Sequence, residues 1–191
     1  MIAIEHLSTL FPIKAVLARP SSSNQRAYAD MIEERACELA QMVYPAEFRS
    51  AQSVRSIEDF AIFHHGRRYL VDVKTRQLTT DFNMPNLISV DRLHRLLADD
   101  GDLYYWFIDY SVVENNNARI DDSVVRPVWD LPWAALSIQN LGLGQLQISD
   151  FKALESSSGL TKTQWHAELQ VAMREFYTRQ SRKFLELAES V

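Results

Sequence analysis

The chain has 191 residues, of which 47% are hydrophobic and few are Gly or Pro, so its composition argues against a disordered chain and predicts one folded domain, or one domain with a small appendage. A single cysteine, Cys37, excludes a disulfide framework and a cysteine-based zinc site, which fits a reducing compartment. The net charge of −5 argues against nucleic-acid binding, but the segment 91–122, with eight acids and three bases, carries all of that excess.

The first predicted elements are a helix and a β-hairpin. Apolar residues recur every three or four positions from Asn24 to Val43, which predicts a helix that Asn24 or a preceding serine can cap. Two apolar runs, roughly 57–63 and 68–76, predict strands joined through the polar turn 64–67. These strands carry the charged residues on which the functional prediction depends.

The rest of the chain alternates between strands and helices. Residues 78–88 are predicted to form a loop, and Ser89 is predicted to cap a short helix. The aromatic and β-branched run 102–113 predicts a central strand, and 124–129 predicts a further strand. A long helix is predicted over 162–188. This order predicts an α/β or α+β domain in which helices flank a mixed central β-sheet.

Nothing in the sequence predicts secretion or membrane insertion. The N-terminal run to Ala18 is fairly apolar, but Glu5 replaces the basic start of a secretory signal, and Pro12 and Lys14 interrupt the run. No stretch approaches the roughly 18 uninterrupted apolar residues of a membrane span. We therefore expect a cytoplasmic protein without a membrane partner.

Three charged residues of the predicted hairpin can form a metal site. Asp72 and Lys74 are two positions apart on one strand, so their side chains share a face and lie roughly 7 Å apart. If the hairpin closes through the turn 64–67, Asp59 comes alongside them. Two carboxylates and one ammonium on a rigid sheet can hold a divalent cation and an attacking water against a phosphodiester. The alternative is an ordinary ion pair between Asp72 and Lys74 on the solvent face of an edge strand.

These residues also resemble a known family. Asp59, twelve intervening residues and then Asp72-Val73-Lys74, preceded by a helix that bears acids, are similar to the PD-(D/E)xK nuclease superfamily. Its type II restriction endonucleases are the most similar, and the hairpin spacing and Asp-x-Lys-Thr ending resemble the HincII and EcoRV branch. One position departs from the pattern, because Glu58 stands where the proline that names the motif would precede Asp59. Glu58 is therefore the alternative to Asp59.

The resemblance implies a fold, a cofactor and roles for particular residues. Mg²⁺, for which Mn²⁺ can substitute, would be bound by Asp59, Asp72 and the backbone carbonyl of Val73, and Lys74 would orient the attacking water. An acid of the first helix often completes such sites, and Glu33 is that candidate, with Glu38 as a second one and ordinary solvated acids as the alternative for both.

The same resemblance divides the single domain, residues 1–191, into three parts. It implies a restriction-endonuclease-like catalytic core at 24–113, a DNA-recognition region at 114–160 and a C-terminal helix at 161–191. The predicted DNA contacts are basic, hydroxyl and amide side chains that can meet phosphates or base edges, each of which could instead be an ordinary surface residue: Arg67, Arg68, Thr75, Arg76, Asn116, Gln139 and Asn140.

We therefore predict a Mg²⁺-dependent type II restriction endonuclease that hydrolyses phosphodiester bonds of double-stranded DNA at a specific short site. A homodimer is expected, because a palindromic site read by identical subunits needs matching symmetry, and the C-terminal helix or the N-terminal segment would supply the interface. Two alternatives stay open: a DNA repair or recombination nuclease of the same fold, and a non-catalytic α/β interaction module.

Overall fold

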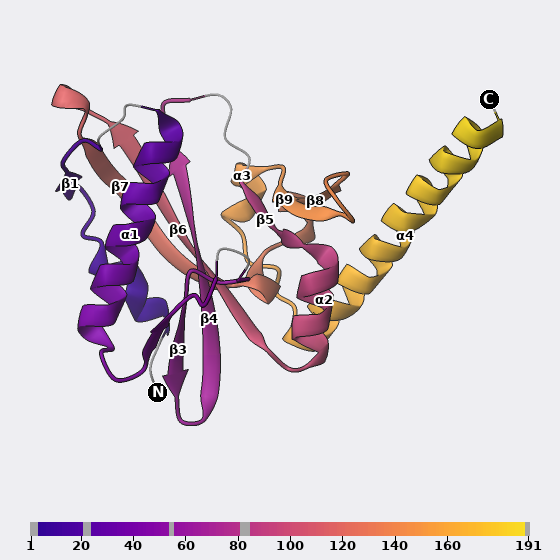
Figure 1. The fold of residues 1–191 in the computed structure, drawn as a ribbon, viewed down its shortest axis with the longest axis horizontal. Coiled ribbons are helices and arrows are strands. Elements are labelled where there is room, and N and C mark those ends of the chain that lie inside the picture. Colours follow the sequence, from indigo (N-terminus) through magenta and orange to yellow (C-terminus); the bar gives the residue numbers. More distant parts are fainter. Residues whose placement is uncertain (1–3, 21–23, 54–55, 81–84, 190–191) are drawn as a thin grey trace. The chain divides into compact units, whose positions relative to one another are not determined.

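The computed structural model describes residues 4–20, 24–53, 56–80 and 85–189. The chain divides into two compact units, and each of them combines two separate segments (Figure 1). Unit 1 comprises Met1–Pro85 and Gly101–Val128, whereas unit 2 comprises Asn86–Asp100 and Trp129–Val191.

Unit 1 is a six-stranded sheet with helices against it. Its elements are the 3₁₀ helix η1 (Ile4–Leu10), β1 (Val16–Leu17), α1 (Gln25–Val43), β2 (Phe48–Ser50), β3 (Phe60–His64), β4 (Arg67–Gln77), β6 (Asp102–Val112), the 3₁₀ helix η2 (Glu114–Asn116) and β7 (Ala118–Pro127). The strand order is β1-β7-β6-β4-β3-β2. Only the β4–β6 pairing is parallel, so the sheet is mixed. The predicted class, a mixed central sheet flanked by helices, is confirmed.

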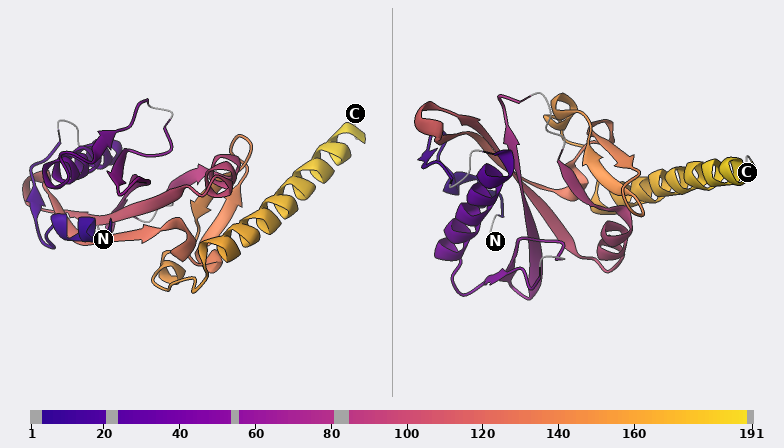
Figure 2. Two further views of the ribbon diagram at one scale, coloured as in Figure 1. Left: turned by 90° about the horizontal axis from the view of Figure 1, so that it is seen from below. Right: turned by 45° about the horizontal axis from the view of Figure 1, so that its top comes forward.

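Helix α1 forms where the sequence predicts it. The side chain of Asn24 accepts a hydrogen bond from the backbone N–H of Ala27 at 2.8 Å and so caps the first turn. Tyr28, Ile32 and Ala36, spaced by four residues, are buried and pack in one core with Val71 and Val73 of β4 and their neighbours. Figure 2 shows α1 lying across one face of the sheet of unit 1.

The β3–β4 hairpin closes more tightly than predicted. His64 pairs with Arg67, so the turn consists of His65 and Gly66 alone, with φ of 49° and 76°. A two-residue turn with positive φ at both positions matches the twist of its strands. The predicted first strand began near residue 57, but β3 begins at Phe60. Asp59 therefore precedes the strand instead of lying within it.

Strand β4 is a central strand. It pairs with β3 on one side and, in parallel, with β6 on the other, where Asp72 lies opposite Tyr105 and Lys74 opposite Phe107. The alternative that placed Asp72 and Lys74 on an edge strand is therefore wrong. Strand β6 occupies the predicted run, but β7 begins at Ala118, six residues before the strand predicted at 124–129.

Unit 2 contains a second, smaller sheet and two longer helices. Its elements are β5 (Asn86–Ser89), α2 (Val90–Ala98), the 3₁₀ helix η4 (Trp133–Ala135), β8 (Leu136–Gln139), β9 (Gln145–Ile148), α3 (Phe151–Leu154) and α4 (Lys162–Glu189); a further 3₁₀ turn, η3 (Val128–Asp130), begins at the last residue of unit 1. The strand order is β5-β9-β8. The loop predicted at 78–88 is therefore wrong at its end, where β5 begins, and its residues 81–84 lie outside the described residues.

Helices α2 and α4 begin as predicted, whereas α3 was not predicted. Ser89 caps α2 by accepting a hydrogen bond from Arg92, and its buried face includes Leu93 and Leu97. In α4, Trp165 is fully buried, stacks on Trp133 with ring centroids 4.8 Å apart, and its indole N–H donates to the carbonyl of Leu131.

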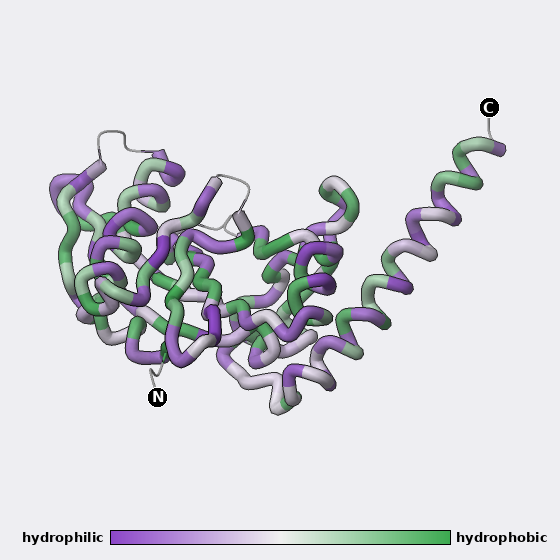
Figure 3. The backbone as a smooth tube through the Cα atoms, turned by 60° about the horizontal axis from the view of Figure 1, so that its bottom comes forward, coloured by the Kyte–Doolittle hydropathy of each residue, from purple (hydrophilic) through white to green (hydrophobic). Residues whose placement is uncertain are grey.

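The apolar residues of α4 are only partly buried. Leu169 and Phe176 are buried, but Phe184 and Leu187 are 65% and 54% exposed. Figure 3 shows hydrophobic residues recurring along the helix toward its C-terminal end. None of the helices in the described part of the chain combines the length and hydropathy that a membrane span requires.

Candidate active site

Asp59 is fixed against β4 at the point where β3 begins. Its backbone N–H donates to the carbonyl of Val71 at 2.9 Å, and its carboxylate accepts a hydrogen bond from the N–H of Val73 at 2.7 Å. The carboxylate of Asp59 thus accepts the Val73 N–H hydrogen bond that a backbone carbonyl of a longer β3 would otherwise accept. Because the N–H and C=O of one extended residue project to the same side of a strand, the carbonyl of Val73 also points to the side of Asp59.

Asp72 and Lys74 project from one face of β4, as the two-residue period requires. The ammonium of Lys74 lies 2.7 Å from Oδ1 of Asp72. Asp72 is 7% exposed, and the Lys74 side chain is 19% exposed. Asp59 acts on Asp72 both through its charge and through a side-chain hydrogen bond. The structure therefore brings the two carboxylates and the ammonium together.

Burial dominates the electrostatics of the site. It raises the pKa of Asp72 to about 7; Lys74 lowers that pKa, and the charge of Asp59 raises it further. Glu33, on the half-buried side of α1, also has its pKa raised to about 7, first by burial and then by Asp59, while Lys74 lowers it. Lys74 thus acts on both raised acids, and Arg26 also acts on Glu33, yet burial and the charge of Asp59 prevail at each of them.

A cleft of about 560 Å³ opens beside these residues within unit 1. It lies between α1, the segment that leads into β3, and β4. Its lining is Asp30, Glu33, Glu34, Cys37, Ala51, Ser53, Ser56, Ile57, Glu58, Asp59 and Asp72. Six of these are acids, so the cleft would attract a cation and would repel a phosphate in its absence.

The donor chemistry of the site suits a hard divalent cation. The predicted ligands are two carboxylates and one backbone carbonyl, and Mg²⁺ prefers oxygen donors while keeping several waters. Among the described residues, no group of three or more His, Cys, Asp or Glu side chains is arranged to hold a metal ion. Glu33 therefore stands near Asp59 and Lys74 without joining Asp59 and Asp72 in a ready-made carboxylate triad.

Glu58 is held differently from Asp59. It is 9% exposed and forms a close ion pair with Arg68, whose guanidinium also lies 5.8 Å from the ring centre of Phe63. Arg68, predicted to contact DNA, thus neutralises Glu58 across the hairpin. Arg67 is similarly paired with Asp102 at 2.8 Å, although its side chain is 57% exposed.

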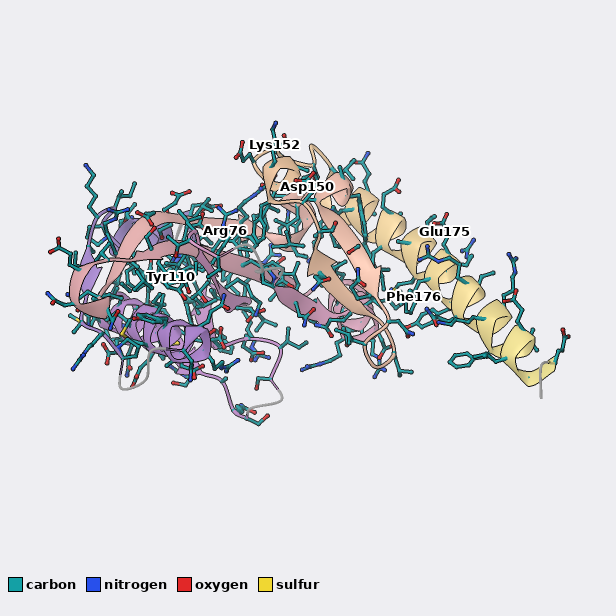
Figure 4. All side chains as sticks on the ribbon, turned by 90° about the horizontal axis from the view of Figure 1, so that it is seen from above. Arg76, Tyr110, Asp150, Lys152, Glu175 and Phe176 are labelled. Carbon is teal, nitrogen blue, oxygen red and sulfur yellow. The ribbon has the colours of Figure 1, made fainter. Side chains whose placement is uncertain are left out.

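The other predicted DNA contacts are dispersed. Arg76, labelled in Figure 4, forms a bidentate ion pair with Asp109 on the neighbouring strand. Thr75, which precedes Arg76 on β4, is half-buried. Asn116, in η2, is exposed and its carbonyl accepts the hydroxyl of Tyr28. Gln139 ends β8, and Asn140 follows it at the turn; both are exposed and belong to unit 2.

Two residues near Asp72 and Asp59 were not among the predicted site residues. Tyr105 lies opposite Asp72 in the parallel register and is fully buried, and its hydroxyl has no hydrogen-bond partner among the described residues. Burial and then Asp72 raise its pKa well above the usual value. Cys37 lines the cleft, and burial, with Asp59 next, raises its pKa to about 12. The position of Tyr105 follows from the parallel pairing of β4 and β6, which no local sequence pattern specifies.

Comparison with known proteins identifies the fold. No protein-family model and no curated protein sequence matches the chain. Among solved structures, it is similar to the NlaIV restriction endonuclease with a TM-score of 0.50 and 14% sequence identity, over 81% of this chain and 76% of that one. The assignment to the PD-(D/E)xK superfamily and to its HincII and EcoRV branch stays a prediction. The chain has a restriction-endonuclease-like fold.

Proposed function

We propose that the protein is a Mg²⁺-dependent endonuclease of the restriction type, which hydrolyses phosphodiester bonds of double-stranded DNA at a short specific site. The observation that carries this proposal is that Asp59 and Asp72 line one acidic cleft, while Lys74 forms an ion pair with Asp72. The likeness of the fold to a restriction endonuclease supports it.

Each residue has a role that its position suits. Asp59, Asp72 and the carbonyl of Val73 would bind the metal, which supplies Lewis-acid polarisation of the phosphoryl group and a more acidic bound water. Lys74 would orient the attacking water and offset the negative charge that develops on the phosphoryl oxygens. Its ion pair with Asp72 keeps the ammonium at the site before the substrate arrives.

The burial of Asp72 also favours a cation. A carboxylate that is almost fully buried beside a second carboxylate is costly to ionise, which is why its pKa is raised to about 7. A divalent ion in the cleft would offset that cost. Metal binding and deprotonation of Asp72 should therefore be coupled.

A digest of a phage genome tests the proposal. Wild-type protein with Mg²⁺ should give discrete bands, and EDTA or Asp72→Ala should leave the DNA intact. Structure-dependent nicking of branched DNA, without discrete bands, would favour the repair nuclease. Intact DNA with wild-type protein, together with no Mg²⁺ binding by calorimetry, would favour the interaction module, in which the Lys74–Asp72 ion pair is structural.

We propose a second copy of the chain as the partner of the C-terminal half of α4. Phe184, Leu185 and Leu187 are all more than half exposed there. The basic residues of this half come first and the acids last, in the order Arg179, Arg182, Lys183, Glu186 and Glu189. Antiparallel pairing of two such helices would place unlike charges together, whereas parallel pairing would place like charges together.

A further inference from the structure

One face of the small sheet in unit 2 carries uncharged hydrogen-bonding side chains. Paired residues of antiparallel strands share a face, and the register pairs Ser137 with Gln147 and Gln139 with Gln145. On the far side of β9, Asn86 and Ser89 of β5 pair with Gln147 and Gln145 and extend this face. The face, named the amide face here, consists of Asn86, Ser89, Ser137, Gln139, Gln145 and Gln147.

The opposite face of the β8–β9 hairpin is apolar. Leu136, Leu146 and Ile148 are buried and Ile138 is half-buried. Apolar and polar residues therefore alternate along both strands of the hairpin, so that one face is buried in unit 2 and the other carries amide and hydroxyl side chains. All six members of the amide face are half-buried or exposed.

The absence of charge in this region is unusual for the chain. Charged residues make up 24% of the sequence, yet none occurs from Leu131 to Ser149. A solvent-facing strand normally carries Lys or Glu, which keep a sheet soluble. An uncharged amide surface instead offers paired donors and acceptors at fixed spacing, which is the chemistry that base edges present.

The hairpin is also held in place. A Cβ on Gly144 would lie 3.0 Å from Phe176 and 3.1 Å from Val90, so the backbone approaches α4 and α2 closely at this glycine. Figure 4 shows Phe176 on the side of α4 toward the strands. The hydroxyl of Tyr177 donates to the carbonyl of Leu143 at 2.7 Å. Recognition by amides needs such a fixed support, because a loose amide loses its bidentate geometry.

We propose that the amide face reads base edges in the DNA major groove, chiefly adenine. This inference rests on the proposed function in taking duplex DNA as the ligand and, for the length of the whole site, on the proposed dimer. A two-stranded ribbon fits the major groove, and a Gln amide can donate to adenine N7 and accept from its N6 amino group. Gln139 also donates to Ser137 at 2.9 Å, which orients its amide.

Strand geometry sets how many base pairs the face can read. Gln145 and Gln147 are two residues apart, which corresponds to roughly 7 Å, or about two steps of the duplex. The face therefore spans about three base pairs in each subunit. A symmetric pair of subunits would read a site of about six base pairs that contains A·T pairs in each half.

The test is a binding selection from a random duplex library, without Mg²⁺ so that no cleavage is needed. Wild-type protein should enrich a short motif with adenines. Gln147→Ala and Gln145→Ala should each flatten the preference at one position and weaken binding to the selected duplex about tenfold. Gln147→Glu should change the preferred base from adenine to cytosine, because a carboxylate accepts from the cytosine N4 amino group.

Two controls separate base reading from folding. Gln170→Ala removes an exposed amide from α4, outside the face, and should leave the motif unchanged. Replacing adenine by 7-deazaadenine in the selected duplex removes the N7 acceptor without changing the protein, and should weaken wild-type binding by a similar factor.

The outcomes decide the inference independently of catalysis. An unchanged motif in all three Gln variants, no effect of 7-deazaadenine, or a wild-type protein that enriches no sequence would each overturn it. A variant-dependent motif from a protein that fails to cleave DNA would support base reading and contradict the nuclease. Cleavage by a wild-type protein that enriches no motif would support the nuclease and contradict base reading.

Discussion

Lys74 holds Asp72 in a 2.7 Å ion pair, yet the pKa of that Asp72 carboxyl is raised to about 7. Burial thus outweighs the attraction of the ammonium, and the neighbouring Asp59 adds to the effect of burial. Carboxylates with pKa values perturbed in this way cluster at functional sites.

The stability of the metal-free protein should fall as pH rises. The folded-state pKa of Asp72, about 7, lies above its ordinary value of 3.8, so the folded state binds the proton more tightly. The associated stability is complete below about pH 4 and is lost as pH rises through about 7. We expect Asp72→Asn to be more stable than wild type at pH 8, on the order of 2 kcal/mol in urea unfolding, and the difference to vanish near pH 4.

A carboxylate outside the site provides the control for this experiment. Asp91→Asn removes a half-exposed acid that is paired with Arg95 on α2, and should change stability by less than about 1 kcal/mol at either pH. Equal behaviour of Asp72→Asn and Asp91→Asn would contradict the account of Asp72.

Lys74→Ala should separate metal binding from catalysis. We expect cleavage to slow by about 100-fold or more, since the ammonium is assigned to the developing charge. Mg²⁺ affinity measured by calorimetry should be retained or increased, because the variant frees Oδ1 of Asp72 from its ion pair. Unchanged cleavage would contradict the role of Lys74 in catalysis, and loss of Mg²⁺ binding would show that Lys74 supports the metal site instead.

The hairpin that carries the site should depend on its turn. Gly66→Ala places a side chain at φ 76°, where no atom crowds it but the backbone is strained, and should cost about 1 kcal/mol. His65→Asn should stabilise slightly, because Asn-Gly suits two positive φ values. Thermal melts of both variants at one pH measure this, and opposite signs from those given would show that the turn adopts another geometry in solution.

Gly144→Ala should destabilise more than Gly142→Ala. Both glycines have positive φ, but a Cβ at 144 would also meet Phe176, Val90 and Ile138 within 3.3 Å, whereas Gly142 has open space. We expect a loss of roughly 2–4 kcal/mol at 144 and about 1 kcal/mol at 142. Urea unfolding measures both, and similar losses would mean that the β8–β9 hairpin does not lie as closely on α4.

Phe184→Glu should shift the oligomeric state toward monomer. The substitution places a charge in the exposed apolar part of α4 and should leave the folded unit intact, because Phe184 is 65% exposed. Sedimentation over a concentration series should show a wild-type dimer and a monomeric variant. A wild-type monomer at every concentration, or an unaffected dimer, would rule out this helix as the interface.

The sequence predicts the elements whose pattern is local. The periodic run 24–43 predicts a helix and the aromatic run 102–113 predicts a strand, and the structure has α1 and β6 at these positions. β5 was missed because it has four residues and pairs with β9, far along the chain. β7 was predicted too short, because its first residues include the exposed Arg119 and Asp122.

In the candidate site, too, the sequence predicts what a local pattern determines and misses what depends on contacts between distant segments. The two-residue period of a strand places Asp72 beside Lys74 without any knowledge of the fold. The position of Glu33 depends on which face of α1 packs against the sheet. Tyr105 lies beside Asp72 only because β6 pairs in parallel with β4. These are long-range contacts, which no local pattern specifies.

Cleavage of duplex phage DNA by Asp59→Asn and Asp72→Asn, compared with Asp91→Asn, tests the central claim most directly. With Mg²⁺ under single-turnover conditions, both site variants should lose cleavage by at least about 100-fold, while Asp91→Asn cuts like wild type. If either site variant cuts DNA at the wild-type rate, the pair of carboxylates beside Lys74 is not the catalytic metal site.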